Sequence, residues 1–261
     1  MHPETQDNEG SGAPVGRGRG GWPFTITLIV LFVGMAGLAA SAAGISAQLL
    51  PRKFTSAQQQ QIMNWETARR WRAVPAGKIF PATITYQLPA YADATSQLPL
   101  HAYRVGIARQ LSCAMASDLA ASRVLSAGHC AALLRATYAD ETDSMLVTVG
   151  VAVMPSAGAA RSAAGKLSAD QKATVRALAF RGTLAASFSD RDRQLSWATS
   201  DGPYVIMSTA GYANSMPHVS VVSDPYADQE MTSVANGIAD AVGAPLGVQP
   251  ATPTCPGAPG C

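Results

Sequence analysis

Residues 24–45, with the sequence FTITLIVLFVGMAGLAASAAGI, contain no charged side chain. A helix needs about 20 mostly apolar residues to cross the hydrocarbon core of a bilayer, so this segment is long enough to be a transmembrane helix. Trp22 and Phe24 stand at its start, where aromatic rings favour the membrane interface. The segment therefore divides the chain into a short N-terminal tail, a membrane helix and the longer part that follows.

The orientation of the segment is indicated more by the cysteines than by the flanking charges. Arg17 and Arg19 precede the segment while Arg52 and Lys53 follow it, so the excess of positive charge on one side is weak. Residues 1–23 are rich in glycine and polar side chains, and we expect a disordered tail in the cytoplasm. All the cysteines follow the apolar segment, which favours an oxidising compartment outside the membrane.

A cleaved signal peptide is the alternative interpretation of residues 24–45. Ala40, Ser41 and Ala42 match a small-residue cleavage pattern, but the apolar run is longer than the usual signal core of about 7–15 residues. We expect a retained anchor in a single-pass protein of the cell membrane. Under both interpretations the C-terminal domain is extracytoplasmic and belongs to the cell envelope.

The four cysteines predict two disulfides. Pairing nearest neighbours gives Cys113–Cys130 and Cys255–Cys261, although four cysteines allow three pairings. By the loop-entropy description, the first bridge would stabilise the fold by about 3 kcal/mol. The second bridge would close the terminal loop CPGAPGC. A metal site is the competing reading, but the chain has no CxxC pair and its histidines are scattered.

The formal net charge of the chain is only +2, which excludes a strong positive electrostatic potential that would attract nucleic acid. One local group of cations follows the apolar segment, and such groups can rest on anionic lipid headgroups. A solvated helix face explains the same charges equally well. The predicted membrane-surface residues are Arg52, Lys53, Arg69, Arg70 and Arg72.

The helix and strand signals indicate an α+β fold. A helix over 55–73 begins with a T-x-x-Q capping box, Thr55 with Gln58. A later helix, 225–242, places Met231, Val234, Ile238 and Val242 on one face, with Asp224 as its cap. Between them we expect strands at 79–88 and 101–108 (with Tyr103, Val105 and Ile107 buried), a short helix at 117–126 capped by Ser117, a hairpin at 131–154, a helix at 156–167, and strands at 175–180 and 204–212, the last being central.

This order of elements predicts one extracytoplasmic domain with a mostly antiparallel sheet and helices packed on one face. The predicted organisation is a tail (1–23), a transmembrane helix (24–45), a juxtamembrane helix (46–77), the α+β domain (78–243) and a Pro/Gly-rich tail (244–261).

The sequence VLSAGHC, ending in His129 and Cys130, resembles the histidine motif of trypsin-like serine proteases. That resemblance implies His129 as a general base, oriented by a carboxylate such as Asp140 or Asp143 and paired with a serine nucleophile. The Gly-Asp-Ser-Gly-Gly signature of the family is absent. We therefore expect an exposed histidine in a disulfide-tied loop, no enzyme activity and no cofactor.

The sequences NWETARRWR and PAGKIFP, at residues 64–72 and 75–81, resemble a group of uncharacterised single-pass membrane proteins of actinobacteria, as do the Ala-rich composition and the closing CPGAPGC. The pattern of residues 135–167 is also similar to extracellular sensor domains of mycobacterial receptor kinases and related lipoproteins. The first group brings no assigned activity, and fold analogy does not confer function.

These observations lead to three hypotheses. The first is a non-enzymatic, membrane-anchored envelope protein whose domain binds a ligand or a protein partner. The second is an extracytoplasmic hydrolase with His129 as base. The third is a structural accessory of a membrane complex, acting through the anchor and the helix that carries Trp65, Arg69, Trp71 and Arg72. We prefer the first, with the lipid bilayer and an envelope protein as partners and no nucleic acid.

Overall fold

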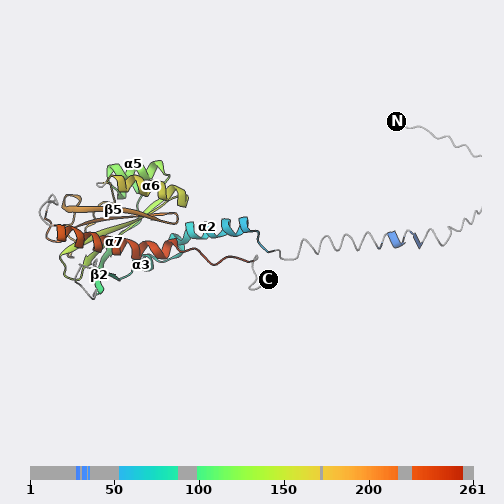
Figure 1. Ribbon diagram of the computed structural model, residues 1–261, viewed down its shortest axis with the longest axis horizontal. Helices are drawn as coiled ribbons and strands as arrows, with labels where there is room; N and C mark the ends of the chain where they lie inside the picture. Colours follow the sequence, from blue (N-terminus) through green and yellow to red (C-terminus); the bar gives the residue numbers. More distant parts are fainter. Residues whose placement is uncertain are drawn as a thin grey trace, which may run out of the picture. The chain divides into compact units, whose positions relative to one another are not determined.

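The computed structural model contains one compact unit, Phe54–Thr254, and assigns residues 1–53 and 255–261 to a second unit (Figure 1). The structure describes residues 28, 29, 31–33, 35, 53–87, 99–170, 173–216 and 225–254. In the second unit, the described residues between 28 and 35 are helical and exposed.

The predicted transmembrane helix falls largely outside the described residues. Among the residues that the structure does describe, no helix combines the length and apolar character needed to span a membrane. A transmembrane helix at residues 24–45 therefore remains a prediction from the sequence.

The compact unit is built on a sheet that has six strands in its described part, all paired antiparallel in the order β1-β2-β3-β4-β6-β5. The α+β class, the antiparallel sheet and the 131–154 hairpin are thereby confirmed. β6 lies between β4 and β5, so the strand at 204–212 is internal as predicted. The strands are β1 (Thr83–Gln87), β2 (Pro99–Ile107), β3 (Ala132–Asp140), β4 (Met145–Val153), β5 (Arg193–Asp201) and β6 (Tyr204–Tyr212).

Helices cover both faces of this sheet, so the prediction that they share one face is wrong (Figure 1). The physical reason lies in β4, in which every residue is buried. A strand with both of its faces buried needs a layer on each side. The helices are α2 (Ser56–Ala73), α3 (Ala76–Ile79), α4 (Cys113–Ala116), α5 (Leu119–Ala127), α6 (Ala157–Ala169) and α7 (Pro225–Gly247).

The main core lies between the sheet and α7. Met231, Val234, Ile238 and Val242 are all buried there, which confirms the apolar face predicted for the last helix. Gly237 lets α7 approach β1 closely, because a Cβ atom at this position would overlap the Cβ atom of Tyr86. The helix continues to Gly247, beyond the predicted end at 242, and includes Pro245. Asp224, its predicted cap, lies outside the described residues.

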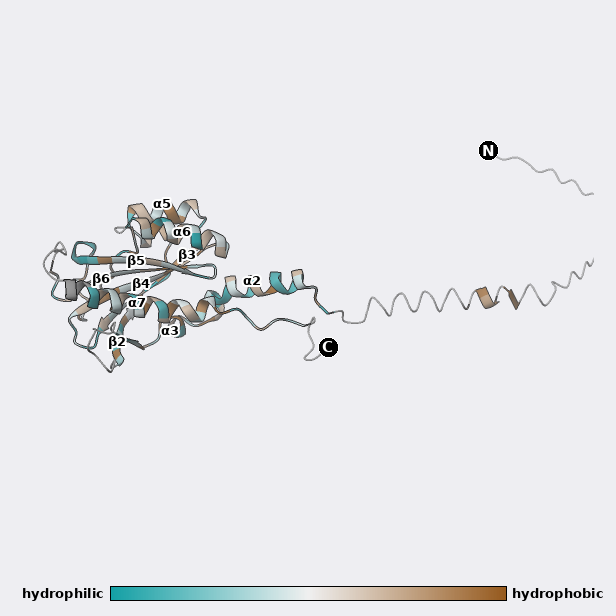
Figure 2. Ribbon diagram, viewed as in Figure 1, coloured by the Kyte–Doolittle hydropathy of each residue, from teal (hydrophilic) through white to brown (hydrophobic). Residues whose placement is uncertain are grey.

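A second core lies on the opposite face, beneath α5 and α6. α6 contributes small side chains such as Ala160 and Ala163, together with Leu167. Both α6 and α7 carry polar as well as apolar residues (Figure 2), as expected for helices with one solvated face. Residues 173–180 also pack on this face, and buried hydroxyls of the sheet hold their backbone: Thr137 Oγ1 donates to the Leu178 carbonyl at 2.8 Å.

Three local predictions differ from the structure. Tyr103 is 48 % exposed, because Ala102 occupies the buried position of β2 and a bulge between Arg104 and Gly106 shifts the register beyond it. α5 is capped by Asp118 rather than Ser117: its side chain accepts from the Ala121 amide at 2.9 Å. The predicted strand at 175–180 forms only an isolated bridge to Ser117, because its other backbone hydrogen bonds go to side chains of the sheet, such as Thr148, and to the backbone of neighbouring loops and α4.

α2 is an integral part of the compact unit. The predicted capping box is confirmed, with the Thr55 hydroxyl accepting from the Gln58 amide and the Gln58 side chain accepting from the Thr55 amide. The chain following α7 returns along α2, where the Phe54 amide donates to the Thr254 carbonyl at 3.1 Å. The described N- and C-terminal ends of this unit therefore lie side by side.

Candidate functional site

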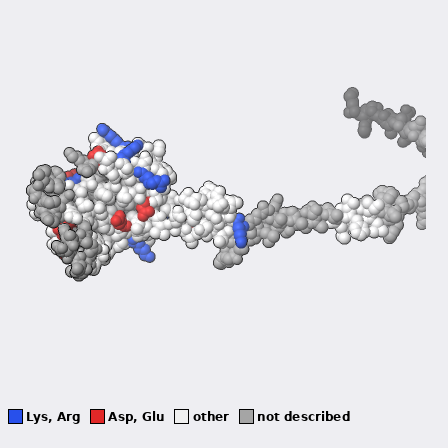
Figure 3. All heavy atoms as spheres, viewed as in Figure 1, with Lys and Arg blue, Asp and Glu red and all other residues white. Residues whose placement is uncertain are grey.

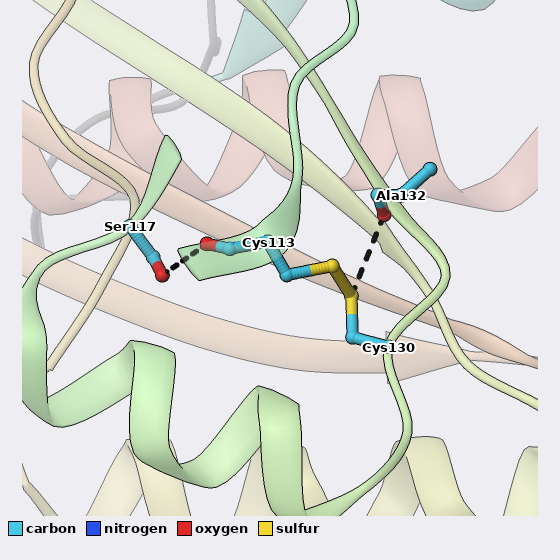
Figure 4. Close-up of a disulfide and its surroundings, with 4 residues drawn as sticks. All are labelled: Cys113, Ser117, Cys130 and Ala132. Atoms are coloured by element: carbon cyan, nitrogen blue, oxygen red, sulfur yellow. Dashed lines mark hydrogen bonds between the residues drawn. A yellow bond between two sulfur atoms is a disulfide. The ribbon is translucent and has the colours of Figure 1, made fainter. Parts of the chain in front are cut away.

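The disulfide Cys113–Cys130 is present, as predicted, with a Cα–Cα distance of 6.2 Å (Figure 4). It ties α4 to the loop that follows α5. Cys113 is buried in the second core, and its carbonyl accepts a hydrogen bond of 2.6 Å from the Ser117 hydroxyl. Cys255 and Cys261 lie outside the described residues, so their pairing stays a prediction.

His129 is exposed and directly precedes the bridged Cys130. Its φ of 58° places it in the left-handed region, where the chain turns from α5 into β3. Within the described part of the chain, no residue makes a hydrogen bond to its imidazole. Asp140 lies at the opposite end of β3, and its carboxylate accepts from the Met145 amide in the hairpin turn at 2.6 Å. Asp143 lies in the same turn, so neither of the two candidate carboxylates lies beside His129.

Three arginines of the predicted cationic group make different contacts within the fold. Arg70 donates to the backbone carbonyls of Pro245, Leu246 and Val248 at 3.0, 2.9 and 2.6 Å, so it closes the end of α7. The guanidinium of Arg69 lies over the Trp65 ring at 4.7 Å. Arg72 lies similarly over Trp71, at 4.8 Å. Lys53 is exposed, and Arg52 lies outside the described residues. Contact of these cations with lipid remains a prediction.

Charged residues on the face shown in Figure 3 are scattered, with basic and acidic side chains interspersed. Nucleic-acid binding needs a basic patch or stripe on one face of a domain. The face shown carries no such patch in its described part.

The candidate site is a pocket of about 370 Å³ where the end of α2 meets the ends of β2 and β3. It is open to solvent on one side. Aromatic and aliphatic side chains form most of its wall, while one guanidinium and one amide supply the polar groups. The lining residues are Trp71, Arg72, Ala76, Phe80, Ile107, Ala108, Gln110 and Leu134.

The Trp71 side of the pocket is fixed by a buried tyrosine. The Tyr204 hydroxyl donates to the Thr67 carbonyl at 2.6 Å and accepts from the Trp71 amide at 3.3 Å. Tyr204 is fully buried, and this burial raises the pKa of its phenol, while the Trp71 amide and the charge of Arg70 oppose the increase. The end of α2 is therefore held in place against β6.

The Phe80 side is fixed by Arg104, which donates to the Phe80 and Gly77 carbonyls across the turn after α3. Phe80 itself is completely buried in the main core. Ile107 and Leu134 are half-buried and pack against the same core. The β2 bulge is what brings Ile107 to this face, because the shifted register pairs it with Ala136.

The lining of this pocket suits the binding of an apolar group. None of the residues lining the pocket carries a carboxylate, hydroxyl, thiol or imidazole, the groups that ordinarily act as nucleophiles or proton carriers. Mostly apolar walls with a few polar groups are instead typical of ligand and partner sites.

A second, smaller pocket of about 180 Å³ lies between β5 and α7 and contains Asp201 and Asp240. Burial raises the pKa of Asp201, and the negative charge of Asp240 raises it further. The described residues hold no cluster of acids, histidines or cysteines suited to a metal ion. The sequence did not single out either carboxyl, because they come from separate elements.

The sequence pointed to Trp71 and Arg72 as part of a helix but not as part of a pocket. The other lining residues come from α3 and the residue after it, from β2 and the loop after it, and from β3, and only the tertiary packing brings them together. No protein-family model, curated protein or solved structure matches the chain.

Proposed function

We propose that the protein is a non-enzymatic, membrane-anchored domain of the cell envelope that binds a protein partner. The observation that carries the proposal is the open pocket at the end of α2, with the apolar wall described above. Its polar groups, from Arg72 and Gln110, suit a carbonyl or carboxylate next to the inserted group. The expected occupant is an apolar or aromatic side chain of the partner.

A protein partner fits this pocket better than an enclosed small molecule. Sites for small ligands bury about 70–90 % of the ligand surface, and this pocket is open along one side. Interfaces, by contrast, often receive one anchoring side chain in a preformed hollow. The rigid backing by Tyr204 and Phe80 supports such a preformed receptor.

The location is part of the proposal. The uncharged segment 24–45 would hold the compact unit at the membrane, and the Cys113–Cys130 bridge suits an oxidising exterior.

Photo-crosslinking in intact cells tests the proposal. Benzoylphenylalanine replaces Gln110 at the pocket, or Ala127 on the exposed surface of α5 as a matched control. We expect a discrete adduct from position 110, identified by mass spectrometry, and a different or absent adduct from position 127. Identical adducts from both positions, or none from position 110, would contradict the proposal.

A variant that fills the pocket sharpens the test. Ala76→Trp adds a large ring at an exposed lining position and should remove the adduct from position 110 while leaving the melting temperature near that of the unsubstituted protein. Retention of the adduct in this variant would show that the partner binds elsewhere. Loss of the adduct after a change of anchor alone would instead favour an accessory role in a membrane complex.

One observation favours that second role. Trp65 is 58 % exposed on α2, with Arg69 stacked over its ring. Tryptophan and arginine are enriched at the energetic centres of interfaces. Trp65→Ala would weaken partner capture under the accessory role and leave it unchanged if the pocket is the main contact.

A further inference from the structure

Arg135 is a charged side chain within the sheet. It lies on β3 between Leu133 and Thr137, on the face that α5 and α6 cover, and is only 7 % exposed. Burying an ionised group without a partner costs several kcal/mol, so buried charges in proteins are ordinarily paired. Arginine cannot avoid this cost by losing its proton.

The guanidinium of Arg135 has no such partner among the residues that the structure describes. Its Nε is buried without a hydrogen bond, and none of the described carboxylates lies within ion-pair distance. Burial lowers the pKa of Arg135; the charge of Asp190 opposes this effect, and that of Arg176 adds to it.

The neighbouring acids are already engaged. Arg193 pairs with Asp118 at 3.0 Å and with Asp190 at 3.3 Å. The Ala177 amide also donates to Asp190, at 2.8 Å. Together with Arg135 and Arg176, this cluster carries one more positive than negative charge.

Arg176 is exposed and held in position. Its backbone amide donates to the Ala116 carbonyl and its Nε to the Ser117 carbonyl, both at 3.0 Å, which leaves its terminal nitrogens available at the surface. Gly150 faces Arg135 across the strand pair, and the missing side chain admits Val175 to that place. The segment carrying Arg176 is thereby packed against the sheet beside Arg135.

We infer that Arg135 and Arg176 form a binding site for a single carboxylate. A planar guanidinium fork matches a carboxylate with two parallel hydrogen bonds, and one negative charge balances the cluster. A phosphate monoester, with a charge of about −1.5 to −2, exceeds that balance. This site lies on the opposite face of the sheet from the α2 pocket, so neither proposal depends on the other.

The test uses the full-length protein and acetate as the probe. The Nε–H resonance of Arg135, assigned by its loss in Arg135→Met, is followed by ¹⁵N NMR while sodium acetate replaces sodium chloride at constant ionic strength. We expect a saturable shift with acetate and a weaker one with phosphate. A resonance that does not move, or moves linearly without saturation, would show a water-solvated arginine and overturn the inference. A stronger response to phosphate would overturn the choice of carboxylate.

Stability measurements give an independent readout. In chloride, Arg135→Met should melt at or above the temperature of the unsubstituted protein, because it removes an unpaired buried charge, and it should lose the stabilisation by acetate. Arg123→Met, at an exposed position of α5, should keep that stabilisation. An equal response to acetate in all three proteins would contradict the site. If Arg135→Met does not fold, Arg135→Lys takes its place, because it keeps the positive charge and removes the planar guanidinium. A stabilisation of Arg135→Lys by acetate as large as that of the unsubstituted protein would also contradict the site.

Discussion

Arg70 offers a sharp test of how the compact unit is held together. Its Nη1 lies 2.6–3.0 Å from three backbone carbonyl oxygens at the end of α7 and, because it carries two N–H bonds, donates about two full hydrogen bonds to them. These carbonyls have no partner within the helix, and a cation at a helix C-terminus also interacts favourably with the helix dipole. Arg70→Met keeps most of the aliphatic stem and removes all of these interactions.

The expected loss follows from the geometry. A hydrogen bond with a charged donor contributes about 1.5–3 kcal/mol. Arg70 is half-buried and water can replace part of each bond, so about 1 kcal/mol per bond is the appropriate value. The variant should therefore lose about 2 kcal/mol, which lowers the melting temperature by about 4–8 °C for a domain of this size.

Arg69→Met is the matched control, one residue earlier on the same helix. Arg69 is exposed and only stacks over Trp65, so its loss should cost under about 0.5 kcal/mol. Urea unfolding of the full-length chain, followed by tryptophan fluorescence, measures both variants. Equal effects of the two substitutions would refute the role assigned to Arg70 and would show that it is a solvated cation like Arg69.

Three further predictions concern the core and the disulfide. Replacing both bridged cysteines by alanine should cost about 3 kcal/mol, measured by the same urea unfolding, and no loss would mean that the bridge does not constrain the unfolded chain. Gly237→Ala should destabilise by about 1–3 kcal/mol because its methyl group overlaps Tyr86, whereas Gly165→Ala on α6, with nothing within 4 Å, should be neutral or stabilising by up to about 1 kcal/mol; the reverse order would contradict the close packing of α7 on β1. Burial and the charge of Asp240 raise the pKa of Asp201 in the folded state, so the contribution of Asp201 to stability is present at low pH and is lost as the pH rises through that raised pKa. Asp201→Asn should remove this part of the pH dependence of the free energy of unfolding. The same pH dependence in the variant and in the unsubstituted protein would contradict the prediction.

Much of the fold was predictable because the local signals were strong. The Thr55–Gln58 capping box, the 131–154 hairpin and the apolar face of α7 each depend on residues close in sequence. The second helical layer was not predicted. The sequence signal for this second layer was the near-continuous apolar sequence of β4, because a strand of that kind is buried on both faces. The β2 bulge left no sequence signal strong enough to correct the orientation of Tyr103.

The candidate sites were harder to predict than the fold. The pocket joins Trp71 to Phe80 and Leu134 only through strand pairing and helix packing, which no local pattern specifies. Arg135 stands in the apolar sequence ALLRATYAD, where a lone arginine among apolar residues is a visible irregularity. Its burial without a partner depends on the segment around Arg176, which sequence alone assigned to a strand.

The central claim is that a disulfide-tied binding domain lies outside the membrane. Labelling of intact cells with a membrane-impermeant maleimide tests it most directly, using Lys166→Cys on the exposed surface of α6. We predict labelling of this variant without permeabilisation, and no labelling of Cys113 or Cys130 until a reductant is added. Labelling at position 166 only after permeabilisation, with the thiols of Cys113 and Cys130 free, would contradict the account.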